Sequence, residues 1–216
     1  MVATDLDKLA HDFAERMQRV LNTTICDCVH ISAVTASKPG VVLVGHGLDR
    51  TSFTSTPFQV GLRKRRPRCW LDIFFKLCLD EPSSYLTVLT SFFGIYAADD
   101  EQSCLCHFDY ERNKADDYPE AHLQIHGDST ALANWSSRQR KRPLNKLHFP
   151  VGGRRFRPSL EDVIEFLIVE NLADPRDDWA VELKKEREEF ARIQLRASIR
   201  SDPHTSLEAA RDLGLI

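Results

Sequence analysis

Histidine and carboxylate side chains, the groups that most often transfer protons in enzymes, gather between residues 104 and 126 of this chain. Within that region the stretch EAHLQIHGD, residues 120–128, places His122 and His126 four positions apart. On a helix this spacing stacks two imidazoles on one face, close enough to share a metal ion, whereas on a strand they lie about 13 Å apart. The local conformation therefore decides which chemistry the pair can do.

The alternation of apolar and polar residues favours a strand. Apolar and polar side chains alternate strictly from 121 to 126, and the preceding run, CLCHFDYE at 104–111, alternates in the same way. Pro119 and Gly127 would suit the two ends of a helix, but two alternating runs with a polar connector predict a β-hairpin. A metalloprotease motif is excluded in either case, because Leu123 stands where H-E-x-x-H requires glutamate.

The predicted hairpin has an apolar face and a polar face. The apolar face, which we expect on the core, consists of Phe108, Tyr110, Leu123 and Ile125. The polar face also carries Gln124, and together with the strand that follows it supplies the candidate catalytic residues: His107, Asp109, Glu111, His122, His126 and His148. One histidine held by a carboxylate could remove a ribose 2'-hydroxyl proton, and a second could protonate the leaving oxygen. The pattern thus predicts acid–base chemistry at a phosphodiester, with no cofactor.

Two other interpretations of this polar face stay open. Asp109, Glu111 and His122 could hold a divalent metal ion, which would make the protein a metal-dependent enzyme. A water-facing sheet surface is also expected to be polar without having any function.

Positive charge is concentrated in separate segments, although the net charge is only −3. The segment RKRRPR at 63–68 carries five positive charges, and residues 129–160 contain eight Lys or Arg and no acid, whereas residues 99–120 have eight acids and two bases. In VGGRRFRPS, at 151–159, two glycines and three arginines before a predicted helix resemble an anion-binding corner. RNA or another phosphate-bearing ligand is therefore the predicted partner. The candidate nucleic-acid-binding residues are Arg63, Lys64, Arg65, Arg66, Arg154, Arg155 and Arg157.

Hydropathy and cysteine usage indicate a protein of the cytoplasm. No apolar run approaches the 18 or so residues of a membrane span, and the charged N-terminus is unlike a signal peptide. The six cysteines include two C-x-C pairs, at 26–28 and 104–106, whose spacing is unusual for a zinc module. We expect reduced, mostly buried thiols and no membrane association.

Periodicity along the chain predicts an α+β fold. Apolar residues recur at helical spacing over 4–22, several β-rich runs follow, and Pro158 suits the start of another helix. We predict an N-terminal helix, a mainly antiparallel sheet of about five to seven strands, a helix after Pro158 and a helical C-terminal arm. The predicted domains are a core at 1–171 and an arm at 172–216.

The predicted arm begins with a long charged helix from Trp179 to about Ser201. Its apolar seam, which Glu186 interrupts, consists of Trp179, Leu183, Phe190, Ile193 and Ala197. This seam could pack back onto the body, or the helix could dock a protein partner through residues 179–200. The second possibility would make the chain a non-catalytic regulatory or binding module.

One region resembles a known family. FDYE at 108–111, then a short polar connector, a histidine-containing strand after a proline, and a final helix resemble the TumE-type toxins of prokaryotic toxin–antitoxin modules, over residues 104–170. The family's consecutive histidines are absent, so only Asp109 and His122 carry over. The resemblance implies a growth-inhibiting toxin, with ribonuclease action as its expected activity, that an antitoxin neutralises.

Overall fold

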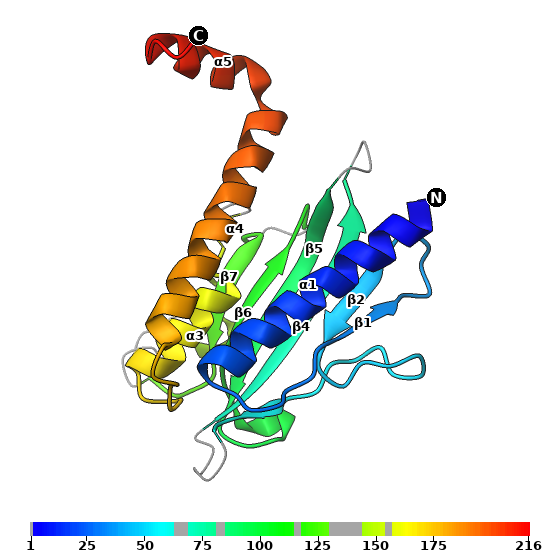
Figure 1. Cartoon of the computed structure of the whole chain (residues 1–216). Coiled ribbons are helices and arrows are strands. Elements are labelled where there is room, and N and C mark those ends of the chain that lie inside the picture. Colours follow the sequence, from blue (N-terminus) through cyan, green and yellow to red (C-terminus); the bar gives the residue numbers. More distant parts are fainter. Residues whose placement is uncertain (1, 63–68, 81–84, 115–117, 130–143, 154–156) are drawn as a thin grey trace, which may run out of the picture.

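The computed structural model describes residues 2–62, 69–80, 85–114, 118–129, 144–153 and 157–216. It shows one antiparallel sheet with helices against one face and a helical C-terminal segment that leads away from the body (Figure 1). The helices are α1 (Val2–Thr24), α3 (Leu160–Val169), α4 (Trp179–Ser201) and α5 (Pro203–Asp212). This is the predicted α+β fold, with the N-terminal helix, the helix after Pro158 and the C-terminal helices in place.

The sheet has eight strands within the described residues. They are β1 (Ser32–Thr35), β2 (Val42–Gly45), β3 (Phe58–Val60), β4 (Cys69–Leu79), β5 (Leu86–Tyr96), β6 (Cys104–Glu111), β7 (Ala121–Ile125) and β8 (Phe149–Pro150). Their order is β1-β2-β4-β5-β6-β7-β8, and β3 pairs with β4 beyond the end of β2. The sheet has one strand more than the predicted upper limit of seven, and two of its strands, β3 and β8, are only three and two residues long.

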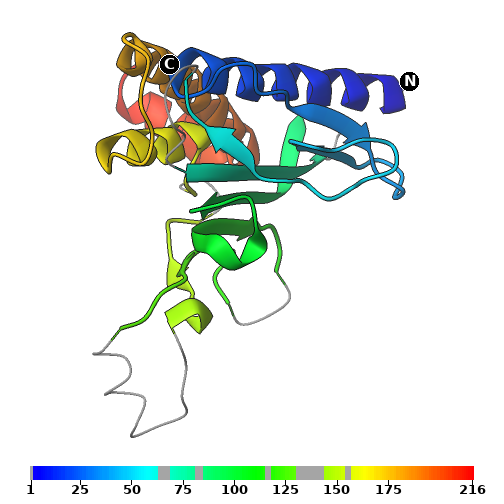
Figure 2. The same cartoon turned by 90° about the horizontal axis from the view of Figure 1, so that it is seen from below.

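Helices α1, α3 and the first half of α4 cover one side of the sheet, which we call the covered face (Figure 2). The apolar stripe of α1 packs on alternate residues of β4, such as Leu71 and Ile73, which are fully buried. Helix α3 begins at Ser159, whose hydroxyl oxygen accepts from the backbone N–H of Asp162, while the carboxylate of Asp162 accepts from the backbone N–H of Ser159. This capping box starts the helix where the sequence predicts it.

The interruption of the α4 seam by Glu186 has a structural reason. Glu186 is buried, and its carboxylate accepts hydrogen bonds from Arg16 at 2.7 Å and from Arg19 at 2.8 Å, both on α1. One turn earlier, Leu183 is buried in the main core. The first half of α4 is therefore part of the body, and α5 is the element that stands away from the sheet (Figure 1). None of the helices in the described ranges has the length and apolar character needed to cross a membrane.

Candidate active site on the open sheet face

The side of the sheet turned away from the helices, here called the open face, carries most of the predicted site residues. Phe93 and Ile95 of β5 lie in the core. Successive residues of a strand face opposite sides of the sheet, so Phe92 and Gly94 belong to the open face. Residues directly opposite each other on paired strands share a face, and the register therefore orders the open face into rows. The Lys76 row is Leu43, Lys76, Thr90 and Glu111; the Asp109 row is Phe74, Phe92, Asp109 and His122; the His107 row is Asp72, Gly94, His107 and Gln124.

Asp109 and His122 form the central pair of this face. They are direct partners across β6 and β7, and His122 Nε2 lies 3.8 Å from Asp109 Oδ2. His122 is buried, with Nδ1 3.3 Å from the carbonyl oxygen of Pro119 and its ring 4.5 Å from that of His148. The ring of His148 in turn lies 4.0 Å from that of Tyr118. His122 thus supports Asp109 from behind, while the side chain of Asp109, 30% exposed, is the member of the pair that a ligand can reach.

A hollow of about 540 Å³ lies in front of Asp109. Its charged and aromatic lining consists of Lys38, Lys76, Asp109, Glu111, Phe53 and Phe74. Two ammonium groups can bind an anionic group, and two phenyl rings offer surfaces for a planar or apolar one. Sequence reasoning missed both lysines and both phenylalanines, although a lysine inside the apolar run DIFFKLCL of β4 was a usable signal.

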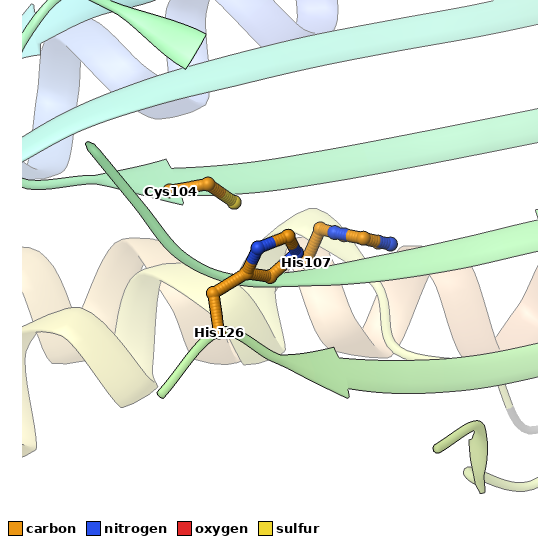
Figure 3. A group of neighbouring side chains, drawn as sticks. All are labelled: Cys104, His107 and His126. Carbon is orange, nitrogen blue, oxygen red and sulfur yellow. The ribbon is translucent and has the colours of Figure 1, made fainter. Parts of the chain in front are cut away.

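A second cluster consists of Cys104, His107 and His126 (Figure 3). Its member His107 belongs to the row next to the Asp109 row. The ring of His107 lies 5.3 Å from the rings of Phe92 and His126, and His107 Nε2 is 2.6 Å from Gln124 Oε1. Burial lowers the pKa of His107, with a smaller contribution from His126, and only partly offset by the hydrogen bond to Gln124. His107 is therefore neutral at pH 7.

The structure brings the six predicted catalytic residues onto one face, but they lie at separate places on it and do not form one site. His122 and His148 support Asp109 at one end, Glu111 lines the hollow, and His107 and His126 form the separate cluster with Cys104. The predicted hairpin is confirmed as the antiparallel pair β6 and β7, and Tyr110 is buried as expected. Ile125, predicted on the core, is instead 36% exposed, because it lies at the end of β7, outside the main core that packs under the helices.

The predicted arginines do not join this face in the described residues. The guanidinium of Arg157 lies 4.7 Å from the ring centre of Tyr110. Tyr110 belongs to the covered face, because its partner Ser91 lies between Thr90 and Phe92, which both point to the open face. Burial lowers the pKa of Arg157. The other predicted nucleic-acid-binding residues, Arg63, Lys64, Arg65, Arg66, Arg154 and Arg155, lie outside the described residues.

The metal set considered from the sequence is not assembled. Among the described residues, the group of His, Cys, Asp and Glu whose ligand atoms converge is Cys104, His107 and His126, and not Asp109, Glu111 and His122. All six cysteines are free thiols, but only Cys26 and Cys69 are buried, so the expectation that most of them are buried is wrong. Burial raises the pKa of Cys26 and of Cys69 to about 12 and that of Cys106 to about 11. Those three thiols are therefore protonated and weak nucleophiles at neutral pH.

Comparison of the chain with protein-family models, with curated proteins and with solved structures returns no match. The resemblance to TumE-type toxins stays a prediction from short motifs. Function therefore has to be inferred from the arrangement of side chains on the open face.

Proposed function

We propose that this chain is a nucleic-acid-acting, toxin-like protein that cleaves RNA on its open face by metal-independent acid–base chemistry. One observation carries the proposal: Asp109, backed by buried His122, stands in the wall of a hollow that also contains two lysines. A carboxylate supported by an imidazole is a proton acceptor, and ammonium groups beside it neutralise a phosphate. The ligand that matches all of these groups is a phosphodiester with a neighbouring hydroxyl, which is RNA.

The proposed reaction is an internal transfer at phosphorus. Asp109 takes the proton of a ribose 2'-hydroxyl, whose oxygen then bonds to the adjacent phosphorus. The bond from phosphorus to the 5'-oxygen breaks, and that oxygen takes a proton from the ammonium of Lys76. The products are a 2',3'-cyclic phosphate and a 5'-hydroxyl end. Lys38 and Lys76 offset the charge that develops on the phosphate, and Phe53 and Phe74 offer stacking surfaces for the bases.

The proposal replaces the arginines of the sequence prediction by lysines and shifts the main role from His122 to Asp109. His122 becomes a positioning residue, because both of its ring nitrogens face protein groups and its ring is buried. Lys76 and Glu111 lie on either side of Thr90 in one row, and both line the hollow, so the predicted carboxylate Glu111 adds a negative charge to its wall.

The test compares Asp109→Asn with a matched control, Asp12→Asn, at an exposed position of α1. Cleavage of a labelled RNA by the full chain in EDTA should fall about 100-fold to 10,000-fold in Asp109→Asn, the usual loss when a general base is removed, and stay unchanged in the control. Circular dichroism checks that both variants fold. Equal cleavage by the two variants, or no cleavage by the original chain, would overturn the proposal.

A second candidate function rests on the C-terminal helices. Leu207 on α5 is 50% exposed, and Leu213 and Leu215 just after it are more than 70% exposed. Exposed apolar side chains on an element that stands away from the sheet are typical of a surface that binds another protein. The chain would then be a toxin whose α5 is held by an antitoxin, or a binding module without catalysis.

Removal of α5 separates this second candidate from the first. A stop after Asp202 leaves Leu183 and Glu186, which anchor α4 to the body, in place. Co-expression with the product of a neighbouring small reading frame should give a complex with the full chain, and the truncated chain should lose it while keeping RNA cleavage. A complex that survives the truncation would exclude α5 as the docking element.

A further inference from the structure

The cluster of Cys104, His107 and His126 is produced by a local irregularity in the sheet. The pairing of β5 with β6 shifts between Ile95 and Tyr96, so that Cys104 stands opposite Tyr96. The backbone N–H of His126 donates to the carbonyl oxygen of Leu105 at 2.8 Å, which brings the end of β7 beside the start of β6. As a result, one ligand atom from each of Cys104, His107 and His126 lies within 4.8 Å of the others (Figure 3).

The hydrogen bonds of Gln124 determine which ring nitrogen of His107 carries the proton. The side-chain amide nitrogen of Gln124 donates to the carbonyl oxygen of Asn145 at 3.1 Å, which turns Gln124 Oε1 toward His107. Oε1 can only accept, so His107 Nε2, 2.6 Å away, must carry the proton. The lone pair of the neutral ring is then on Nδ1. A histidine that donates one ring N–H to a fixed acceptor and keeps the other nitrogen free has the arrangement of a metal ligand.

From this geometry we infer that Cys104, His107 and His126 bind a zinc ion. One thiolate and two imidazoles are a donor set that Zn²⁺ prefers, and three protein ligands leave a fourth position for water. Tetrahedral zinc requires ligand atoms about 3.5 Å apart, so a separation near the 4.8 Å limit has to shorten by about 1 Å. The exposed side chain of His126 can make that movement. On binding, the thiol of Cys104 releases its proton to water and the thiolate sulfur bonds to zinc.

This site differs from both metal possibilities raised by the sequence. It uses neither Asp109, Glu111 and His122 nor a pair of C-x-C motifs; it combines one cysteine with two histidines from the two strands of the hairpin. It is independent of the proposed RNA cleavage, which uses Asp109 and Lys76 and is measured in EDTA. Zinc binding and RNA cleavage can therefore succeed or fail separately.

The test uses the full chain purified without a histidine tag and stripped with EDTA. Titration with Zn²⁺ by calorimetry should show one ion bound per chain, and Co²⁺ should give the thiolate-to-metal absorption band that only a cysteine ligand produces. Cys104→Ser should remove that band and weaken zinc binding at least tenfold, while Cys28→Ser, at an exposed cysteine outside the cluster, should change neither.

The role of Gln124 gives a second, milder variant that does not remove a ligand. Gln124→Ala removes the acceptor that holds the His107 proton on Nε2. Zinc binding should then weaken about 10-fold to 100-fold, the usual effect of losing a hydrogen-bond partner of a metal-binding histidine. Absence of one-to-one zinc binding by the original chain would overturn the inference. Binding that is the same in Cys104→Ser and Cys28→Ser, with circular dichroism showing both folded, would overturn it equally.

Discussion

The two faces of the same sheet differ in what their side chains do. On β4, Leu71 and Ile73 point to the covered face and are fully buried in the main core, whereas Asp72 and Lys76 point to the open face. The covered face is a continuous apolar surface under three helices. The open face combines charged, aromatic and histidine side chains in rows. Stability and proposed chemistry are therefore separated by the alternation of side chains along single strands.

The largest difference in stability between the two faces is expected when a core side chain on the covered face is removed. Leu71→Ala removes a fully buried side chain and should lower the free energy of unfolding by about 2–5 kcal/mol. Thr90→Ala, on the open face, should change it by about 0.5 kcal/mol or less. Urea unfolding of both variants measures the difference. Similar losses from the two variants would show that the open face is also part of the stabilising core.

A smaller loss of folding stability is expected when the ion pairs that hold α4 to α1 are removed. Burial alone would raise the pKa of Glu186, but the hydrogen bonds from Arg16 and Arg19 hold it below the ordinary value of a glutamate. Glu186→Gln should cost about 1–3 kcal/mol at pH 7, less than a fully buried pair because both arginines are partly exposed.

The stability lost in Glu186→Gln should depend on pH, because the pKa of Glu186 is lowered in the folded state. A carboxylate with a lowered pKa stabilises the folded state above its unfolded pKa, and this contribution disappears as the pH falls through the folded value. The difference between the original chain and Glu186→Gln should therefore shrink below about pH 4.5. The exposed Glu188, changed to Gln, is the control on the same helix. A difference that stays constant down to pH 3 would contradict the ion-pair explanation.

Substitution of His122 tests whether a buried side chain affects the rate of RNA cleavage on the open face. His122→Gln keeps a polar side chain but removes the imidazole behind Asp109, and kcat for RNA cleavage should fall about tenfold, equivalent to about 1.4 kcal/mol, with KM unchanged. His11→Gln, on the exposed side of α1, is the control. An increase in KM with unchanged kcat would show that His122 only shapes the binding surface.

The smallest expected effect concerns Asp72, the buried acid of the open face. Burial raises the pKa of Asp72, opposed in part by a hydrogen bond from Ser55. A raised pKa means that the folded state loses stability as the pH rises above the unfolded value of about 3.8. Asp72→Asn should therefore raise the melting temperature by about 2 °C at pH 7 and have no effect near pH 4. A lower melting temperature at pH 7 would show that the ionised carboxylate is stabilising.

The sequence was sufficient for the fold and for the hairpin because both depend on local periodicity. Alternation over 104–111 and 121–126 placed Asp109 and His122 on one face, and helical spacing together with Pro158 placed α3. These patterns repeat within a few residues and need no knowledge of distant parts of the chain.

The features that could not be predicted all depend on long-range register. The hollow brings together Lys38, Lys76 and Asp109 from separate elements, and only the pairing of β2, β4, β5 and β6 makes them neighbours. Cys104 reaches the histidines because the pairing shifts beside Tyr96. The burial of His122 under His148 likewise requires the chain to return after a long connection. Spacing along the sequence contains none of this information.

The most direct measurement of the central claim is the chemistry of the cleaved RNA ends. The full chain, incubated in EDTA with an RNA of defined sequence, should produce fragments that end in a 2',3'-cyclic phosphate and begin with a 5'-hydroxyl, and Asp109→Asn should produce almost none. A 2'-deoxy substitution at the cleaved nucleotide should block the reaction, because the attacking hydroxyl is missing. Cleavage of the 2'-deoxy substrate, or cleavage that Asp109→Asn leaves intact, would contradict the account.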